Sequence, residues 1–157
     1  QKSVEIGEDS VKIHKITREI SENEGIQIKT ALTMFNIYLK EADMIIAHNI
    51  SFDTNVISVE AVRNDIDINF AEIGKYCTMR KGTALCQIKK KTKDGREYNK
   101  YPKLIELHKQ LFNTEPKNLH NAFIDILICL RCYCMMEYKR DIVNECRRIK
   151  LWLRKCL

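Results

Sequence analysis

The spacing of apolar residues predicts an α/β fold in the first half of the chain. Apolar side chains recur at helical spacing over residues 30–41, which predicts an amphipathic helix. A short, wholly apolar run at residues 44–47 is typical of a buried central strand. A further helix over residues 54–64 and a second strand over residues 73–79 are expected to follow.

The second half of the chain predicts a hairpin and then mostly helices. The Asp94-Gly95 pair favours a β-hairpin with a type I′ turn. Pro102 is expected at the N1 position of a helix that ends near Asn113. A long apolar helix is predicted from about residue 122 to 138. Residues 139–157 predict a basic amphipathic helix that docks on the domain through its apolar side.

Composition and charge narrow the class of protein. With 157 residues, 45% of them hydrophobic, the chain is predicted to form one domain over residues 1–157. No apolar run approaches the roughly 18 residues that cross a bilayer, so we expect no membrane partner. No charged-then-apolar secretory leader opens the given sequence, and we expect an intracellular protein, cytoplasmic or nuclear. The net charge of +6 suits a polyanionic partner, although many basic proteins bind none.

The cysteines leave two interpretations open. Cys129, Cys132 and Cys134 have a spacing that occurs in zinc sites, but the first two fall in a predicted helix and no second pair of ligands accompanies them. Reduced, partly buried thiols of an intracellular protein are therefore favoured over a zinc protein.

A carboxylate within the long apolar helix is the first candidate for chemistry. Burying Asp125 without a partner is costly, so it needs a cation, hydrogen-bond donors or a metal. Five residues span about 500° of helix, so His120 approaches Asp125 only if it lies in the loop that enters the helix. There the helix dipole favours the neutral imidazole that a general base requires. The alternative is a capping histidine beside a solvated or ion-paired aspartate.

A second candidate follows the predicted central strand. Asp53 lies where residues 44–47 give way to the next helix, and open α/β sheets place ligand chemistry beyond the carboxyl ends of their strands. The alternative is that Asp53 is only a helix N-cap. The hairpin offers a third candidate, because its lysines, with Tyr98 and Tyr101, suit a nucleic-acid backbone and its bases. The alternative there is a solvated hairpin without a ligand.

These candidates lie in the order of a known set of motifs. Asn49-x-x-Phe52-Asp53 and His120-x-Ala122-x-x-Asp125 resemble the second and third motifs of the DEDDh 3′–5′ exonucleases, the family of ribonuclease T and the proofreading epsilon subunit. The segment Ile13–Thr17 is similar to the family's Ile-His-Gly-Ile-Thr, with lysine in place of glycine. Residues 101–112 resemble the helix before the third motif. The resemblance covers residues 11–138, and the position that is tyrosine in the DEDDy branch is Asn121 here.

The resemblance implies a ribonuclease H-like fold, with a mixed sheet flanked by helices. It also implies a two-metal hydrolysis of phosphodiester bonds at the 3′ end of single-stranded DNA or RNA. Two Mg²⁺ or Mn²⁺ ions would be held by Asp125 directly and by Asp53 partly through water. His120 would deprotonate the attacking water. Three residues are implied to contact the terminal nucleotide: Asn49, Phe52 and His14. A DNA polymerase is an implied partner, in replication, repair or proofreading, and the family has cellular, phage and viral members.

The sequence departs from this family in its first motif. No Asp-x-Glu occurs in the 157 residues, and the family's first strands are expected to precede Gln1. Two aspartates and a histidine do not neutralise two divalent cations, so we expect this chain alone to be a poor nuclease. An N-terminally incomplete exonuclease domain is favoured. The alternative is a non-catalytic module of the same fold that binds nucleic acid or a polymerase.

Overall fold

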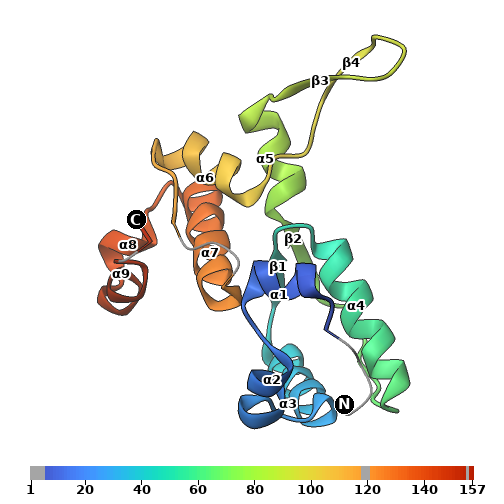
Figure 1. Ribbon diagram of the computed structural model, residues 1–157. Coiled ribbons are helices and arrows are strands. Elements are labelled where there is room, and N and C mark those ends of the chain that lie inside the picture. The colour runs from blue at the N-terminus through green and yellow to red at the C-terminus, as the bar shows by residue number, and fades with distance from the viewer. Residues whose placement is uncertain (1–5, 118–120, 155) are drawn as a thin grey trace. The chain divides into compact units, whose positions relative to one another are not determined.

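Helices and short strands together form the chain, which confirms the predicted α/β class (Figure 1). The computed structural model describes residues 6–117, 121–154 and 156–157. The chain divides into two compact units. Unit 1 contains the residues up to Ile45 together with Ser51–Gly74, and unit 2 contains Ile46–Ile50 and the residues from Lys75 onward. The expectation of one domain over residues 1–157 stays a prediction.

Unit 1 is helical. It contains α1 (Glu8–His14), α2 (Arg18–Glu24), α3 (Ile28–Glu41) and most of α4 (Ile50–Arg63). The predicted amphipathic helix is confirmed as α3, which begins two residues earlier than expected. Its buried side carries Leu32 and Leu39, and the Phe35 ring packs against Phe70 with 6.1 Å between ring centroids. The predicted helix over residues 54–64 is confirmed as α4, but it begins four residues earlier, at Ile50.

The predicted central strand is confirmed as β1 (Met44–Ala47), which pairs with β2 (Gly74–Cys77) in a two-stranded sheet. The second strand was expected to reach residue 79, and this extension is wrong. Helix α5 (Thr78–Cys86) begins directly after β2 instead. The side chain of Thr78 is fully buried there.

The hairpin is confirmed, but its predicted turn type is wrong. Strands β3 (Lys89–Lys91) and β4 (Glu97–Asn99) pair antiparallel. The Thr92 N–H donates to the Arg96 carbonyl at 2.9 Å, and the Gly95 N–H donates to the Thr92 carbonyl at 3.0 Å. A type I′ turn needs positive φ at two residues, whereas within this loop only Gly95 has it, with φ 84°. The connection is therefore a three-residue loop that ends on a left-handed glycine.

Unit 2 also contains the later helices, α6 (Leu104–Phe112), α7 (Ala122–Tyr138), α8 (Ile142–Glu145) and α9 (Arg147–Leu153). The long apolar helix is confirmed as α7. Pro102 does not occupy the N1 position, because Lys103 is the N-cap of α6 and its N–H donates to the Glu106 carboxylate at 2.7 Å.

The prediction of one basic helix over residues 139–157 is wrong. The backbone of Cys146 is extended, with φ −117° and ψ 105°, and it separates α8 from α9. The expected docking of the apolar side is confirmed, since Ile149 and Leu153 belong to the core of unit 2.

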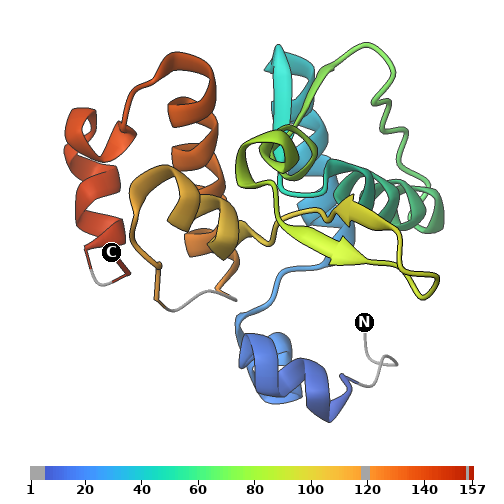
Figure 2. The same cartoon turned by 90° about the horizontal axis from the view of Figure 1, so that it is seen from above.

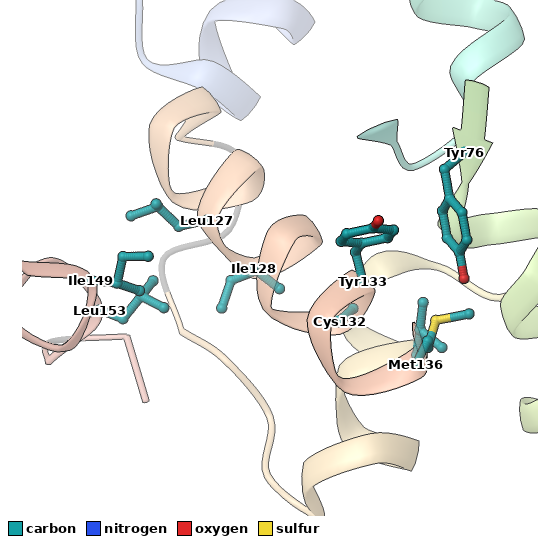
Figure 3. Close-up of a cluster of buried hydrophobic side chains, with 9 residues drawn as sticks. Tyr76, Leu127, Ile128, Cys132, Tyr133, Met136, Ile149 and Leu153 are labelled. Atoms are coloured by element: carbon teal, nitrogen blue, oxygen red, sulfur yellow. The ribbon is translucent and has the colours of Figure 1, made fainter. Parts of the chain in front are cut away.

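Helix α7 forms the centre of that core (Figure 3). Leu127 and Ile128 face Ile149 and Leu153 of α9, whereas Tyr133 and Met136 lie toward Tyr76 of β2. The rings of Tyr76 and Tyr133 meet edge to face at 4.8 Å between centroids, and the Tyr76 hydroxyl donates to Glu137 at 2.6 Å. The core thus fixes α7, and with it the first turn that carries Asp125. None of the described helices is long and apolar enough to cross a membrane.

Candidate functional site

The turn after β1 is held in place by the ring of His48. Its Nε2 lies 3.0 Å from the Pro102 carbonyl oxygen, and its Nδ1 lies 2.9 Å from the Thr78 hydroxyl. Because a carbonyl only accepts, Nε2 carries the proton in this bond. The next residue, Asn49, is half-buried and has a left-handed backbone with φ 84°. This conformation turns the chain sharply from β1 into α4.

Asp53 lies in the first turn of α4, with an exposed side chain. The alternative that Asp53 is the N-cap is wrong, because the helix already begins at Ile50. Carboxylate oxygens of this kind are suitable ligands for a hard divalent cation. Phe52 beside it is 63% exposed, so its ring is available to a ligand.

Asp125 lies in the first turn of α7 and is half-buried. The cap of this helix is Asn121, whose side-chain oxygen accepts hydrogen bonds from the N–H groups of Phe123 at 3.1 Å and Ile124 at 3.3 Å. The backbone N–H of Asp125 donates to the Asn121 carbonyl at 2.9 Å, which starts the regular helical pattern. His120, the predicted general base, lies outside the described residues.

The predicted site residues are distributed over both units. Asp53, Phe52 and His14 belong to unit 1, whereas Asn49 and Asp125 belong to unit 2. Each unit is described by itself, so the convergence of Asp53, His120 and Asp125 stays a prediction. His14 is half-buried at the end of α1, and its Nδ1 accepts a hydrogen bond from the Ile16 N–H at 3.0 Å.

Asp53 and Asp125 offer the right type of ligand for a hard divalent cation, but two carboxylates are too few for two such ions. Carboxylate oxygens of Asp53 and Asp125 are the ligands that Mg²⁺ and Mn²⁺ prefer. Within the described residues, no group of three or more His, Cys, Asp or Glu side chains is arranged to hold a metal ion. The seven cysteines form no disulfide, and Cys129 and Cys132 lie buried in α7.

Unit 1 contains a groove of about 690 Å³. It is lined by residues from the end of α3 and from the segment after α4, including Asn36, Asp65 and Asp67. None of the predicted site residues in the described part of the chain lines it.

A buried polar network in unit 2 was not anticipated from the sequence. His108 is fully buried in this network. Arg131 donates from Nη1 to His108 Nε2 at 2.8 Å and pairs with Asp141 through two bonds of 2.8 and 2.7 Å. The Arg131 guanidinium also lies 3.8 Å from the centroid of the Phe112 ring. The sequence feature that could have indicated this network is Arg131, because a charged residue in the middle of an apolar helix needs polar partners.

Burial and charge shift the pKa values in this network. Desolvation lowers the pKa of His108, and Arg131 adds to the effect. The hydrogen bond from Arg131 lowers the pKa of Asp141. Because a guanidinium only donates, His108 Nε2 accepts, and Nδ1–H donates to the Thr114 carbonyl at 2.9 Å. His108 is therefore the neutral tautomer, used for structure.

Comparison with known protein families decides the assignment. A model of the exonuclease family matches residues 1–133. The chain belongs to the exonuclease family. No curated protein and no solved structure gave a significant match. The matched range contains the segments around Asp53 and Asp125 on which the resemblance to DEDDh exonucleases rested. The predicted family is therefore confirmed. The mixed α/β architecture is consistent with a ribonuclease H-like exonuclease domain. Membership supports nuclease activity of the hydrolase class, and exonucleases of this family generally use divalent metal ions.

Proposed function

We propose that this exonuclease-family chain is a 3′–5′ exonuclease domain that hydrolyses phosphodiester bonds at the 3′ end of single-stranded DNA or RNA. One observation carries the proposal. The family match over residues 1–133 includes both motif aspartates, and each of them lies in the first turn of a helix. Helix α4 follows β1 through the left-handed Asn49, and α7 is capped by Asn121.

Each residue has a distinct role in this proposal. Asp125 and Asp53 would hold the Mg²⁺ or Mn²⁺ ions through their carboxylate oxygens. A pair of such ions, when bound, stabilises the attacking and leaving oxygens at phosphorus. His120 removes the proton from the attacking water. Asn49, Phe52 and His14 contact the terminal nucleotide.

We further propose that these 157 residues alone are a poor nuclease. Two aspartates supply two negative charges, whereas two divalent ions carry four positive charges. The sequence contains no Asp-x-Glu to supply the remaining carboxylates. We therefore expect weak metal binding and slow hydrolysis. The proposed partners are a nucleic-acid strand and a DNA polymerase.

The experiment measures Mn²⁺ binding and strand degradation with the same protein. Isothermal titration with Mn²⁺ is expected to give weak binding that Asp125→Asn and Asp53→Asn each reduce further. Asp94→Asn is the matched control, because this aspartate lies in the hairpin and pairs with Arg96 at 2.6 Å. Any metal-dependent product from single strands labelled at one end is expected to come from the 3′ end and to disappear in Asp125→Asn. Full metal-dependent activity of Asp125→Asn would remove the assignment of this residue.

A second candidate function has its own support. The sequence contains no Asp-x-Glu, so the chain supplies fewer carboxylates than two divalent ions need, which favours a non-catalytic module that binds nucleic acid or a polymerase. Such a module binds single strands in a salt-dependent way and releases no nucleotide at any Mg²⁺ or Mn²⁺ concentration. Mn²⁺ binding that neither Asp53→Asn nor Asp125→Asn changes, together with retained strand binding, would favour this candidate.

A further inference from the structure

The β3–β4 hairpin carries positive charge that the proposed active site does not use. The side chains of both strands are exposed, from Lys89 to Lys91 and from Glu97 to Asn99. Figures 1 and 2 both show the hairpin extending away from helices α7, α8 and α9 of the same unit. Its side chains are therefore accessible to a ligand.

The register of the two strands separates these side chains into two faces. Lys90 lies directly opposite Tyr98, so the two side chains share one face. Lys89 lies opposite Asn99 and Lys91 lies opposite Glu97, on the other face. Tyr98 is 46% exposed, which leaves part of its ring open beside the Lys90 ammonium group.

Some of the positively charged side chains of the hairpin form ion pairs, and others do not. Lys91 lies 3.8 Å from Glu97, and Arg96 lies 2.6 Å from Asp94. Among the ion pairs of the described residues, none includes Lys89, Lys90 or Lys93. These three lysines, which we call the open lysines, carry charge without a protein carboxylate to neutralise it.

The base of the hairpin is fixed next to the turn after β1. Lys100 pairs with both oxygens of Glu106 at 2.5 and 2.7 Å, and its side chain is only 18% exposed. Two residues later, the carbonyl of the buried Pro102 accepts the hydrogen bond from His48. His48 directly precedes Asn49, so the hairpin is anchored to the turn that carries a proposed nucleotide contact.

We propose that this hairpin binds the backbone of a single-stranded nucleic acid, with Tyr98 stacking on a base and the open lysines contacting phosphates. A single strand is the occupant that the observations favour, because its unstacked bases can reach an exposed ring and its phosphates are spaced along a chain of cations. The paired strands carry no aliphatic side chain that would suit a membrane surface or an apolar protein groove. This contact is additional to the proposed contacts with the 3′-terminal nucleotide. Only the direction in which the strand would lie on the hairpin depends on the proposed function.

The test measures binding without any divalent ion, so that its outcome is independent of nuclease activity. Fluorescence anisotropy of a labelled single strand in EDTA is recorded over a series of salt concentrations. The triple variant Lys89→Gln, Lys90→Gln and Lys93→Gln is expected to weaken binding by tenfold or more at low salt. It is also expected to reduce the slope of log affinity against log salt by about 2, since each phosphate contact on a single strand contributes about 0.7. Tyr98→Ala is expected to weaken binding on the order of tenfold, and Tyr98→Phe to retain it.

A charge-matched control separates a hairpin site from a general effect of net charge. Lys12→Gln, Lys29→Gln and Lys40→Gln remove the same number of charges from exposed positions in unit 1. This control is expected to leave binding close to that of the parent chain. Equal losses in both triple variants would overturn the proposal, as would a loss confined to Arg147→Gln, Arg148→Gln and Lys150→Gln in α9. Unchanged thermal unfolding of the hairpin triple variant verifies that the fold is intact.

Discussion

Lys15 occupies a backbone conformation that is costly for a residue with a side chain. It ends α1 with φ 62° and ψ 9°, and its N–H donates to the Val11 carbonyl at 2.8 Å. A left-handed residue at this position is usually glycine, because glycine has no Cβ to clash with the backbone. A glycine at this position, as in the resembling Ile-His-Gly-Ile-Thr segment, would adopt this conformation without the steric cost.

Lys15→Gly is therefore expected to stabilise the protein. Relief of the left-handed strain exceeds the added entropy of the unfolded chain, and we expect the free energy of unfolding to rise by roughly 0.5–1 kcal/mol. Lys12→Gly in the same helix is the control and is expected to lower it by about 1 kcal/mol. Urea denaturation followed by circular dichroism measures both. Destabilisation by Lys15→Gly would show that the lysine side chain contributes more than the strain costs.

Among the helices, α9 separates into a buried and an exposed side within seven residues. Leu153 is fully buried in the core of unit 2, whereas Leu151 is 56% exposed. Leu153→Ala is expected to lower the free energy of unfolding by about 2–5 kcal/mol, because it leaves a cavity beside α7. Leu151→Ala makes the same chemical change on the exposed side and is expected to stay within about 0.5 kcal/mol. Similar losses from the two variants in urea denaturation would contradict the docking of α9.

Elements with a strong local pattern could be predicted from the sequence, and elements set by distant contacts could not. β1 and α7 were predicted because their apolar runs have few alternatives. Helix α5 was missed because Gly82 in its middle disfavours a helix. The structure needs this glycine, since an added Cβ would lie 2.7 Å from Leu107 Cδ1. The break at Cys146 has no glycine or proline to mark it.

In the candidate site, too, features with a local sequence pattern were predicted and contacts between distant residues were not. The positions of Asp53 and Asp125 were found from the order of two motifs, and both do lie at the beginnings of helices. The start of α4 was misplaced because the left-handed Asn49, which begins the helix early, gives no signal in the apolar pattern. The Arg131 network was missed because its partners lie 10 and 23 residues away in the chain. Only the folded chain brings such groups together.

At the scale of the whole molecule, this network makes the stability of unit 2 depend on pH. It joins α6 through His108, α7 through Arg131 and the start of α8 through Asp141, with 9% and 16% of the Arg131 and Asp141 side chains exposed. Removing one partner of such a group leaves the others buried and unpaired, which costs several kcal/mol in comparable cases, about 3–5. Protonation of His108 has the same effect, because its Nε2 then no longer accepts from Arg131.

The free energy of unfolding is therefore expected to decrease as the pH falls below about 6.5, the ordinary pKa of histidine. Burial lowers the pKa of His108 in the folded state, so the unfolded chain binds the proton first and acid favours unfolding. The lowered pKa of Asp141 adds a second loss at more acidic pH, below the ordinary aspartate range of about 4. His108→Gln keeps an acceptor for Arg131 without the titrating ring, and it is expected to flatten the upper part of the profile while leaving the lower part. Urea titrations at a series of pH values measure both parts. An unchanged slope just below pH 6.5 in His108→Gln would assign the upper part of the profile to another histidine.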